Sequence, residues 1–149
     1  MSESQGLALH YAGPIVVTVV YLAFYYILQI RIMRTKLRLH RIYAERGERF
    51  DRYFGQDREM LAADRAQLNV LEHMPPFLAL LWLEALFISP FGATVAGAVY
   101  LATRVMYPFV LGSRMGRDIK IKILLVTGPG YLVLIYFMGS LLWGSLFSR

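Results

Sequence analysis

The chain of 149 residues contains no cysteine. This absence excludes disulfide bridges, catalysis by a cysteine thiol and metal sites built from thiolates. The 3 histidines, His10, His40 and His73, stand in separate segments and give no ligand spacing, so we expect no metal site. Acidic residues are also few, with 10 Asp and Glu against 16 Lys and Arg. The sequence therefore favours neither a metalloenzyme nor an enzyme with a catalytic cysteine.

Long stretches without charge are what the sequence has in excess. Hydrophobic residues make up 57% of the chain, above the roughly 45–50% of soluble domains. No charge occurs in the 17 residues of range 14–30 or in the 26 residues of range 123–148. Between them, range 73–109 is broken only by Glu84 and Arg104. About 17–25 apolar residues span the hydrocarbon of a bilayer, so these stretches supply four spans.

We therefore predict an all-α integral membrane protein, a single domain over residues 1–149 whose four transmembrane helices form a bundle. The expected spans cover about residues 11–34, 58–88, 93–111 and 119–147. Ser89-Pro90-Phe91-Gly92 is expected to be a tight turn between the second and third spans. The basic end of the first helix should continue as an amphipathic cytoplasmic extension. The residues before Pro14 lack the basic region of a cleaved signal peptide.

Positive charge is concentrated in two connections. Range 31–65 contains 10 of the 16 basic residues, range 114–122 contains 4 more, and the turn at 89–92 has none. By the positive-inside rule, the first and third connections face the cytoplasm and both termini face outward or into a lumen, in a bacterial inner membrane or an endomembrane. The basic excess would meet anionic lipid head groups. No folded soluble module is predicted, so we expect no nucleic-acid partner.

The second predicted span opens with a cluster of polar side chains. At about 100° per residue, Arg65, Asn69 and Glu72 fall on one helix face, whereas Gln67 points to the other side. One interpretation is an interfacial cap that only touches head groups. Glu72 lies about 25 Å along the helix from Ser89, however. A carboxylate at that depth needs a partner.

Arg104 is a candidate partner for Glu72. It lies about 21 Å along the third predicted helix, which is nearly the depth of Glu72. We therefore expect an ion pair between Glu72 and Arg104 that ties the second helix to the third. Tyr107 lies one turn further and is level with the cluster. The same residues would also be compatible with a polar pocket at the cytoplasmic end of the bundle.

The stretch RAQLNVLEHMPPF at 65–77 resembles the MAPEG family, the membrane-associated proteins in eicosanoid and glutathione metabolism. Its members include microsomal glutathione transferases and leukotriene and prostaglandin E synthases. The family pattern R-A-x-x-N-x-x-E, followed by an aromatic residue and a proline, is met by Arg65, Ala66, Asn69, Glu72 and Pro75. The stretch YLATRVMYPF at 100–109 resembles the third helix of the family. The resemblance implies a homotrimer that binds glutathione between protomers near the cytoplasmic face.

The resemblance also implies roles for individual residues. Six of them would contact glutathione: Arg34, Arg65, Gln67, Asn69, Glu72 and Tyr107. Of these, Gln67 and Arg34 would serve the neighbouring protomer. A cationic pocket suits glutathione because the tripeptide carries two carboxylates, and arginine binds a carboxylate through two parallel hydrogen bonds.

The residues that activate the thiol in glutathione-conjugating members are not matched. The second tyrosine of the family falls at Leu111, the thiolate-stabilising arginine falls at Asp118, and the aromatic residue after the motif's glutamate is His73. An acid beside a thiol raises the pKa of that thiol. Arg114 or Arg117 would substitute after a change of register, which makes these two the catalytic candidates.

Two functions remain open and a third is disfavoured. The first is binding of glutathione or a similar anionic amphiphile, with thiol conjugation of a lipophilic small molecule or peroxide reduction as the reaction. The alternative is a non-catalytic lipid-binding or scaffold protein of the same fold. A transporter or channel would need polar residues at the midplane, where the first helix and most of the fourth are apolar.

Overall fold

The computed structural model describes residues 3–116 and 121–147. Along these residues the chain forms the helices α1 (Glu3–His10), α2 (Ala12–Glu45), α3 (Arg58–Phe87), α4 (Pro90–Leu111) and α5 (Ile121–Phe147). The four helices α2 to α5 are each long and apolar enough to cross a membrane. The prediction of an all-helical chain with four apolar spans is confirmed. The short helix α1 was not expected.

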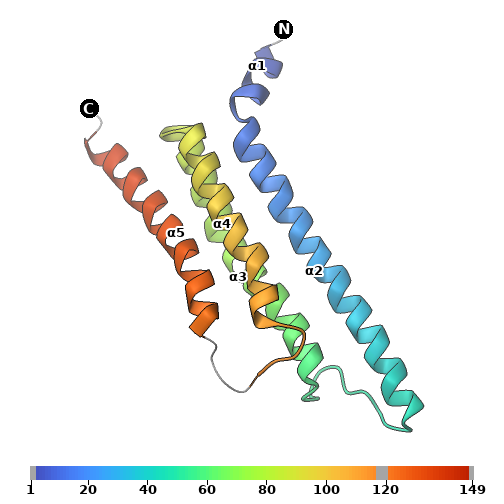
Figure 1. Ribbon diagram of the computed structural model, residues 1–149. Coiled ribbons are helices and arrows are strands. Elements are labelled where there is room, and N and C mark those ends of the chain that lie inside the picture. The colour runs from blue at the N-terminus through green and yellow to red at the C-terminus, as the bar shows by residue number, and fades with distance from the viewer. Residues whose placement is uncertain (1–2, 117–120, 148–149) are drawn as a thin grey trace.

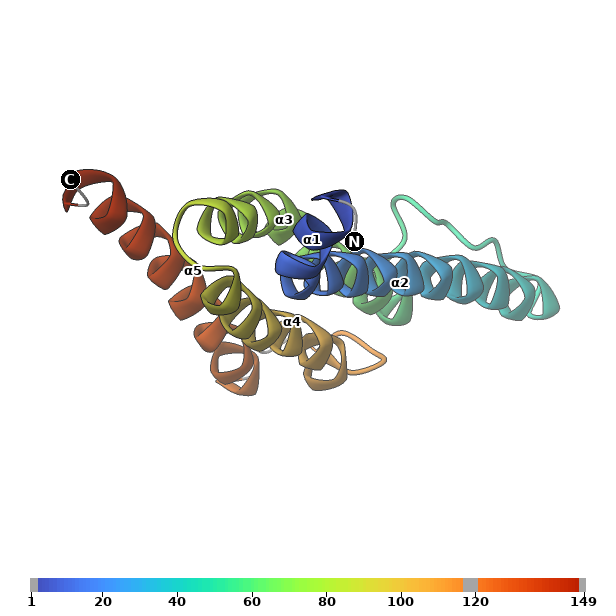
Figure 2. The ribbon, with the colours of Figure 1, turned by 90° about the horizontal axis from the view of Figure 1, so that it is seen from above.

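The four long helices run alternately up and down. Both ends of the chain lie at one end of the molecule, and the 46–57 connection lies at the other (Figure 1). Seen from above, α3 and α4 lie between α2 and α5 (Figure 2). The central pair therefore contacts both outer helices, and any polar group on α3 or α4 can be covered from two sides.

Side-chain caps set the starts of the two central helices. Asp57 Oδ1 accepts the Glu59 and Met60 amides at 2.9 and 3.0 Å, which begins α3. Ser89 Oγ accepts the Gly92 amide at 3.0 Å, and Pro90 suits the first turn of α4 because that turn needs no amide donor there. Helix α4 therefore begins at Pro90. The turn predicted from the sequence at residues 89–92 had placed this start at Ala93.

Three aromatic rings from three helices form the centre of the bundle. Phe77 of α3 stacks on Tyr100 of α4 with ring centroids 4.1 Å apart, and Tyr21 of α2 lies 5.1 Å from Phe77. The Tyr21 hydroxyl donates to the Val70 carbonyl at 2.8 Å. Stacked and tilted rings at these separations add directional attraction to the burial of apolar area. This cluster fixes α2, α3 and α4 relative to one another.

Helix α2 extends well past the membrane-spanning part of the bundle. From Arg31 to Glu45 it adds about 22 Å at 1.5 Å per residue. The extension packs on the start of α3 through a small core of Leu39, Met60 and Ala63. Polar ties close it, namely an Arg38–Glu59 ion pair and a 3.0 Å hydrogen bond from the Tyr43 hydroxyl to Asp57. The start of α3 and the end of α2 thus form a helical hairpin.

Candidate functional site

The polar cluster of α3 divides into an outer and an inner part. Arg65 and Glu72 lie on the surface with about half of each side chain exposed, and Arg65 Nη1 is 4.0 Å from Glu72 Oε1. Asn69 between them is 8% exposed and points into the bundle. The shared face predicted for the three residues therefore straddles the edge of the protein core.

Asn69 meets Arg104 inside the bundle. Arg104 Nη1 donates to Asn69 Oδ1 at 3.1 Å, and Arg104 Nε donates to Thr103 Oγ1 at 3.3 Å. The structure thus gives Arg104 a different partner from Glu72, which faces Arg65. The rise per residue fixes the depth of Arg104 along α4 but not the rotation of that helix. Packing turns Arg104 to the inner side of α3, whereas Glu72 is on the outer side.

Arg104 is a buried cation with no carboxylate partner among residues 3–116 and 121–147. Its side chain is fully buried, and Nη2 has no hydrogen-bond partner. None of the ion pairs formed by the described residues includes it. A Cβ added to Gly130 of α5 would lie 2.6 Å from Nη2, so the guanidinium rests against the α5 backbone. The Tyr100 ring, 5.0 Å away, provides a cation–π contact but no countercharge.

The Arg104 contact determines what Asn69 can offer a ligand. A guanidinium only donates, so Asn69 must use its oxygen toward Arg104 and keeps its NH2 group for other partners. The inner part of the site therefore presents an amide donor backed by a positive charge. An anionic or hydrogen-bond-accepting group is the ligand chemistry that suits this arrangement.

The remaining residues expected to bind glutathione differ in their surroundings within the protomer. Gln67 is buried on the far side of α3, and Tyr107 packs with Ala66 and Leu111. Arg34 is exposed on α2, beside a groove of about 450 Å³ that only α2 residues line. The structure brings Arg65, Asn69 and Glu72 together but does not bring Arg34 to them.

Arg114, a catalytic candidate, follows α4 in the chain and lies in space beside the start of α3. Met115 beside it donates its amide to the Arg58 carbonyl at 2.9 Å, and Arg58 Nε donates to the Met115 carbonyl at 2.7 Å. Arg58 is about two helical turns, or about 10 Å, from Arg65 along α3. Arg117 and Asp118 lie outside the described residues.

Sequence reasoning missed the surroundings of Glu84. Glu84 interrupts an apolar stretch of the sequence only five residues before Ser89, yet its side chain is fully buried. It accepts hydrogen bonds from the Tyr136 hydroxyl at 3.3 Å and from the Ser140 hydroxyl. The two donors are four residues apart on α5, so they share one face of that helix. This spacing of hydroxyls in an apolar helix is a signal that the sequence does contain.

Comparison with known proteins adds to this geometry. The model of the MAPEG family matches residues 14–143. A stretch of 43 residues is 44% identical to leukotriene C4 synthase of Bos taurus and covers 29% of this chain and 29% of that protein. The match to that relative thus spans less than a third of either chain. The resemblance recognised in the sequence is confirmed by the family match.

Proposed function

Because the chain belongs to the MAPEG family, we propose that it binds glutathione, or a similar anionic amphiphile, within the membrane near the cytoplasmic ends of its helices. Family membership and the similarity to leukotriene C4 synthase support a membrane function related to glutathione. The observation that carries the proposal is the buried Arg104 guanidinium, which donates to Asn69 and has no carboxylate partner among residues 3–116 and 121–147.

The outer and inner parts of the site fit different groups of glutathione. Arg65 and Glu72, of opposite charge and 4.0 Å apart, complement the carboxylate and ammonium at one end of the tripeptide. The Asn69 amide would donate to an acceptor further in. The positive charge of Arg104 favours the anionic form of any group bound beside it. The bound tripeptide would supply a thiol as the reacting group.

We propose that the complete site forms between copies in a homotrimer. Arg34 lies on the exposed surface of α2 and is not brought to Arg65, so a neighbouring protomer would have to supply it to the ligand. Gln67, proposed for the same role, is buried within its own protomer and would have to turn outward on assembly. Native mass measurement in mild detergent should return trimers, and monomers alone would contradict the proposal.

The proposed orientation places both termini outside and the 46–57 and 112–120 connections in the cytoplasm. Single cysteines at Ser4 and Glu48, two exposed positions, can test it by labelling intact cells from outside. Labelling is expected at residue 4 alone, and labelling at residue 48 alone would reverse the orientation. A cysteine at Gly55 of the same connection is not suitable for this labelling, because its Cβ would lie 2.3 Å from the Asp51 carbonyl oxygen.

Binding should be measured before any reaction. Glutathione binds only the native state in this proposal, so it should raise the melting temperature of the protein in detergent. Arg65→Ala removes a charged hydrogen-bond donor worth about 1.5–3 kcal/mol, which predicts at least a tenfold weaker binding. The absence of a melting shift at any glutathione concentration would contradict the proposal.

The reaction that such a site would support is addition of the thiol to a lipophilic electrophile or reduction of a peroxide. In the first, sulfur forms a bond to an electrophilic carbon while a C–O or C=C bond of the substrate opens, and the proton lost by the thiol is taken up by the substrate atom that receives the electron pair of the opened bond. In the second, two thiols become a disulfide while the peroxide becomes an alcohol and water. Lipophilic substrates would reach the site from the bilayer.

A non-catalytic lipid-binding or scaffold function is the second candidate, and two observations favour it. Leu111 is buried against Tyr107 where a second tyrosine was expected, and Arg114 is about two turns from Arg65.

The ultraviolet absorbance of bound thiolate and the conjugation rate separate the two functions. We expect binding with weak conjugation in the native protein and faster conjugation in Asp118→Arg, because a cation favours the thiolate. Fast conjugation in the native protein that survives loss of Arg114 and Arg117 would contradict this assignment.

A further inference from the structure

The 46–57 connection contains a tight turn, here the 50–55 turn, that holds two aromatic side chains in the open. Tyr53 is 82% exposed and Phe54 is 87% exposed. Asp51 Oδ1 accepts both of their amides, at 3.0 and 2.9 Å. Gly55 completes the turn, because a Cβ there would lie 2.3 Å from the Asp51 carbonyl oxygen. The local hydrogen bonds therefore fix the backbone that carries both exposed rings.

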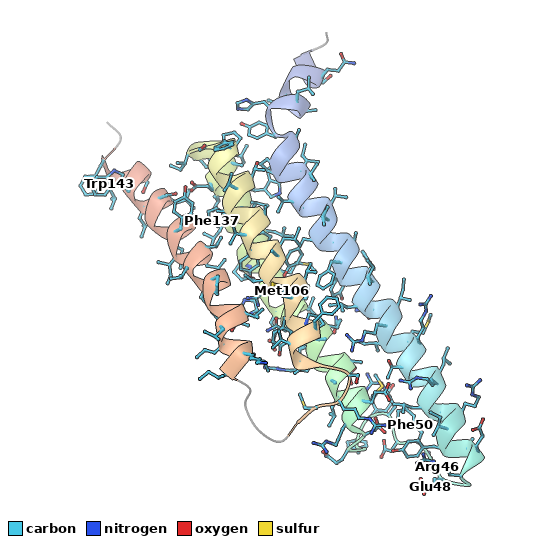
Figure 3. All side chains as sticks on the ribbon, in the orientation of Figure 1. Arg46, Glu48, Phe50, Met106, Phe137 and Trp143 are labelled. Carbon is cyan, nitrogen blue, oxygen red and sulfur yellow. The ribbon has the colours of Figure 1, made fainter. Side chains whose placement is uncertain are left out.

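The 50–55 turn is fixed to the side of α3 rather than to the tip of the hairpin. Both Nη atoms of Arg52 donate to the carboxylate of Asp64, each at 2.8 Å. Phe50 packs on Tyr43 with ring centroids 5.4 Å apart. Figure 3 shows Arg46 and Glu48 at the outer end of the hairpin and Phe50 on the side nearer the bundle. The chain therefore folds back from the end of α2 toward the membrane-spanning part.

The Arg52–Asp64 contact gives the depth of the turn. Asp64 lies about 35 Å from Phe87 along α3, at 1.5 Å per residue. The hydrocarbon core of a bilayer is about 30 Å thick, with about 5–7 Å of head groups on each side. With Phe87 at one edge of the hydrocarbon, the other edge falls near Leu68, which is 39% exposed. Asp64, and with it the 50–55 turn, is then level with the head groups.

We propose that the 50–55 turn is a membrane anchor whose Tyr53 and Phe54 rings insert among the head groups of the bilayer that the four helices cross. Aromatic rings concentrate at this level of a membrane, where one part of the ring system is apolar and another is wet. Basic residues of α2 that form no ion pair among the described residues would draw anionic lipids to this side: Arg31, Arg34 and Lys36. The anchor holds the start of α3, and so Arg65, at a set depth.

A single tryptophan at position 54 tests the anchor in liposomes of phosphatidylcholine with phosphatidylglycerol. The variant carries Phe54→Trp with Trp82→Phe and Trp143→Phe, which remove the 2 native tryptophans. Phospholipids brominated near the glycerol end of the acyl chain should quench its fluorescence more strongly than those brominated near the chain end. Soluble acrylamide should quench it several-fold less than free tryptophan. The matched control is Glu48→Trp without the native tryptophans, which should be quenched by acrylamide and not by brominated lipid.

Two results would overturn the proposal. If acrylamide quenches the Phe54→Trp variant as strongly as the Glu48→Trp control and brominated lipid has no effect, the turn faces water. If neither acrylamide nor brominated lipid quenches the Phe54→Trp variant, a protein surface such as a second copy of this chain covers the turn.

A further change tests whether the turn itself positions the rings. Adding Asp51→Ala to the Phe54→Trp variant removes both amide caps, so it should reduce the quenching by brominated lipid. The melting temperature of the bundle should stay within about 2 °C, because the substituted side chain is on the surface. Lipid quenching unchanged by Asp51→Ala would show that the turn does not position the rings.

Discussion

Arg104 of α4 donates to Asn69 of α3 across the centre of the bundle, at 3.1 Å between Nη1 and Oδ1. A fully buried arginine usually has a carboxylate for a partner, because the desolvation of an isolated charge is costly. Here the partner is a neutral amide, and Nη2 has no hydrogen-bond partner in the part of the chain that the structure describes. The protomer thus retains a positive charge in its interior, and this charge links stability to ligand choice.

Asn69→Asp should separate stability from ligand binding. A carboxylate at this position would pair with the buried guanidinium, so we expect a higher melting temperature in detergent. The same change cancels the charge that attracts an anion and replaces an amide donor by an acceptor. Glutathione binding, measured by calorimetry, should weaken by at least tenfold.

Asn69→Leu is the matched control for that experiment. It removes the acceptor of Arg104 without adding charge, and leaving a buried donor unsatisfied costs about 1–3 kcal/mol. The melting temperature should therefore fall, opposite in sign to the effect of Asn69→Asp. A fall of similar size in both variants would mean that Arg104 does not behave as an uncompensated cation.

Gly130→Ala tests the contact between Arg104 and α5. The added methyl group would lie 2.6 Å from Nη2 and 2.9 Å from Thr103 Oγ1, so the guanidinium would have to move. Overpacking of this kind costs about 1–3 kcal/mol, which should appear as a lower melting temperature. Gly128→Ala on the same helix is the control, since nothing lies within 4 Å of its added Cβ. Equal losses at both positions would contradict the close approach at Gly130.

Double-mutant cycles can identify the partner of Arg104. Arg104→Gln combined with Asn69→Leu should be strongly non-additive in unfolding free energy, because each change removes the same hydrogen bond. Arg104→Gln combined with Glu72→Gln should be additive within about 0.5 kcal/mol, because Glu72 lies on the outer side of α3 beside Arg65. A large coupling energy between Arg104 and Glu72 would show that these two side chains do pair, as their similar depth in the membrane predicts.

The pH dependence of the 50–55 turn follows from Asp51. The amide of Phe54, and next that of Tyr53, holds the pKa of the Asp51 carboxyl below its usual 3.8. A carboxyl whose pKa is lowered by folding stabilises the turn fully above its unfolded pKa, and the effect is lost as pH falls through the lowered value. The acrylamide quenching of the Phe54→Trp variant should therefore stay constant down to about pH 4 and change only below it. Asp51→Asn keeps an acceptor oxygen and should remove the pH dependence.

The sequence predicts the spans well because charge and length decide them. The uncharged range 14–30 lies within α2 and most of range 123–148 lies within α5. The start of α4 was placed too late because Ser89 and Pro90 were treated as a turn, although together they form a helix cap. Capping residues and turn residues are the same types, and only the backbone of the next residues separates the two.

The site was predicted in part for a related physical reason. Periodicity puts Arg65, Asn69 and Glu72 on one face, but it does not say where the protein core ends across that face. The rise per residue gives the depth of Arg104, but the rotation of α4 depends on contacts such as Gly97 against Leu81. Side-chain partners between helices therefore had to come from packing, which a single sequence does not reveal.

The burial of Glu84 has a consequence for how the chain is made. During synthesis α3 enters the membrane before α5 has left the ribosome, so the Tyr136 and Ser140 hydroxyls are not yet present to bond this carboxyl group. Until they arrive, Glu84 is an unpaired polar group among lipid chains, which costs several kcal/mol. A nascent chain halted before residue 121 would thus keep α3 less firmly inserted than the finished protein does. Helix α5, the last to be made, thus completes the insertion of α3.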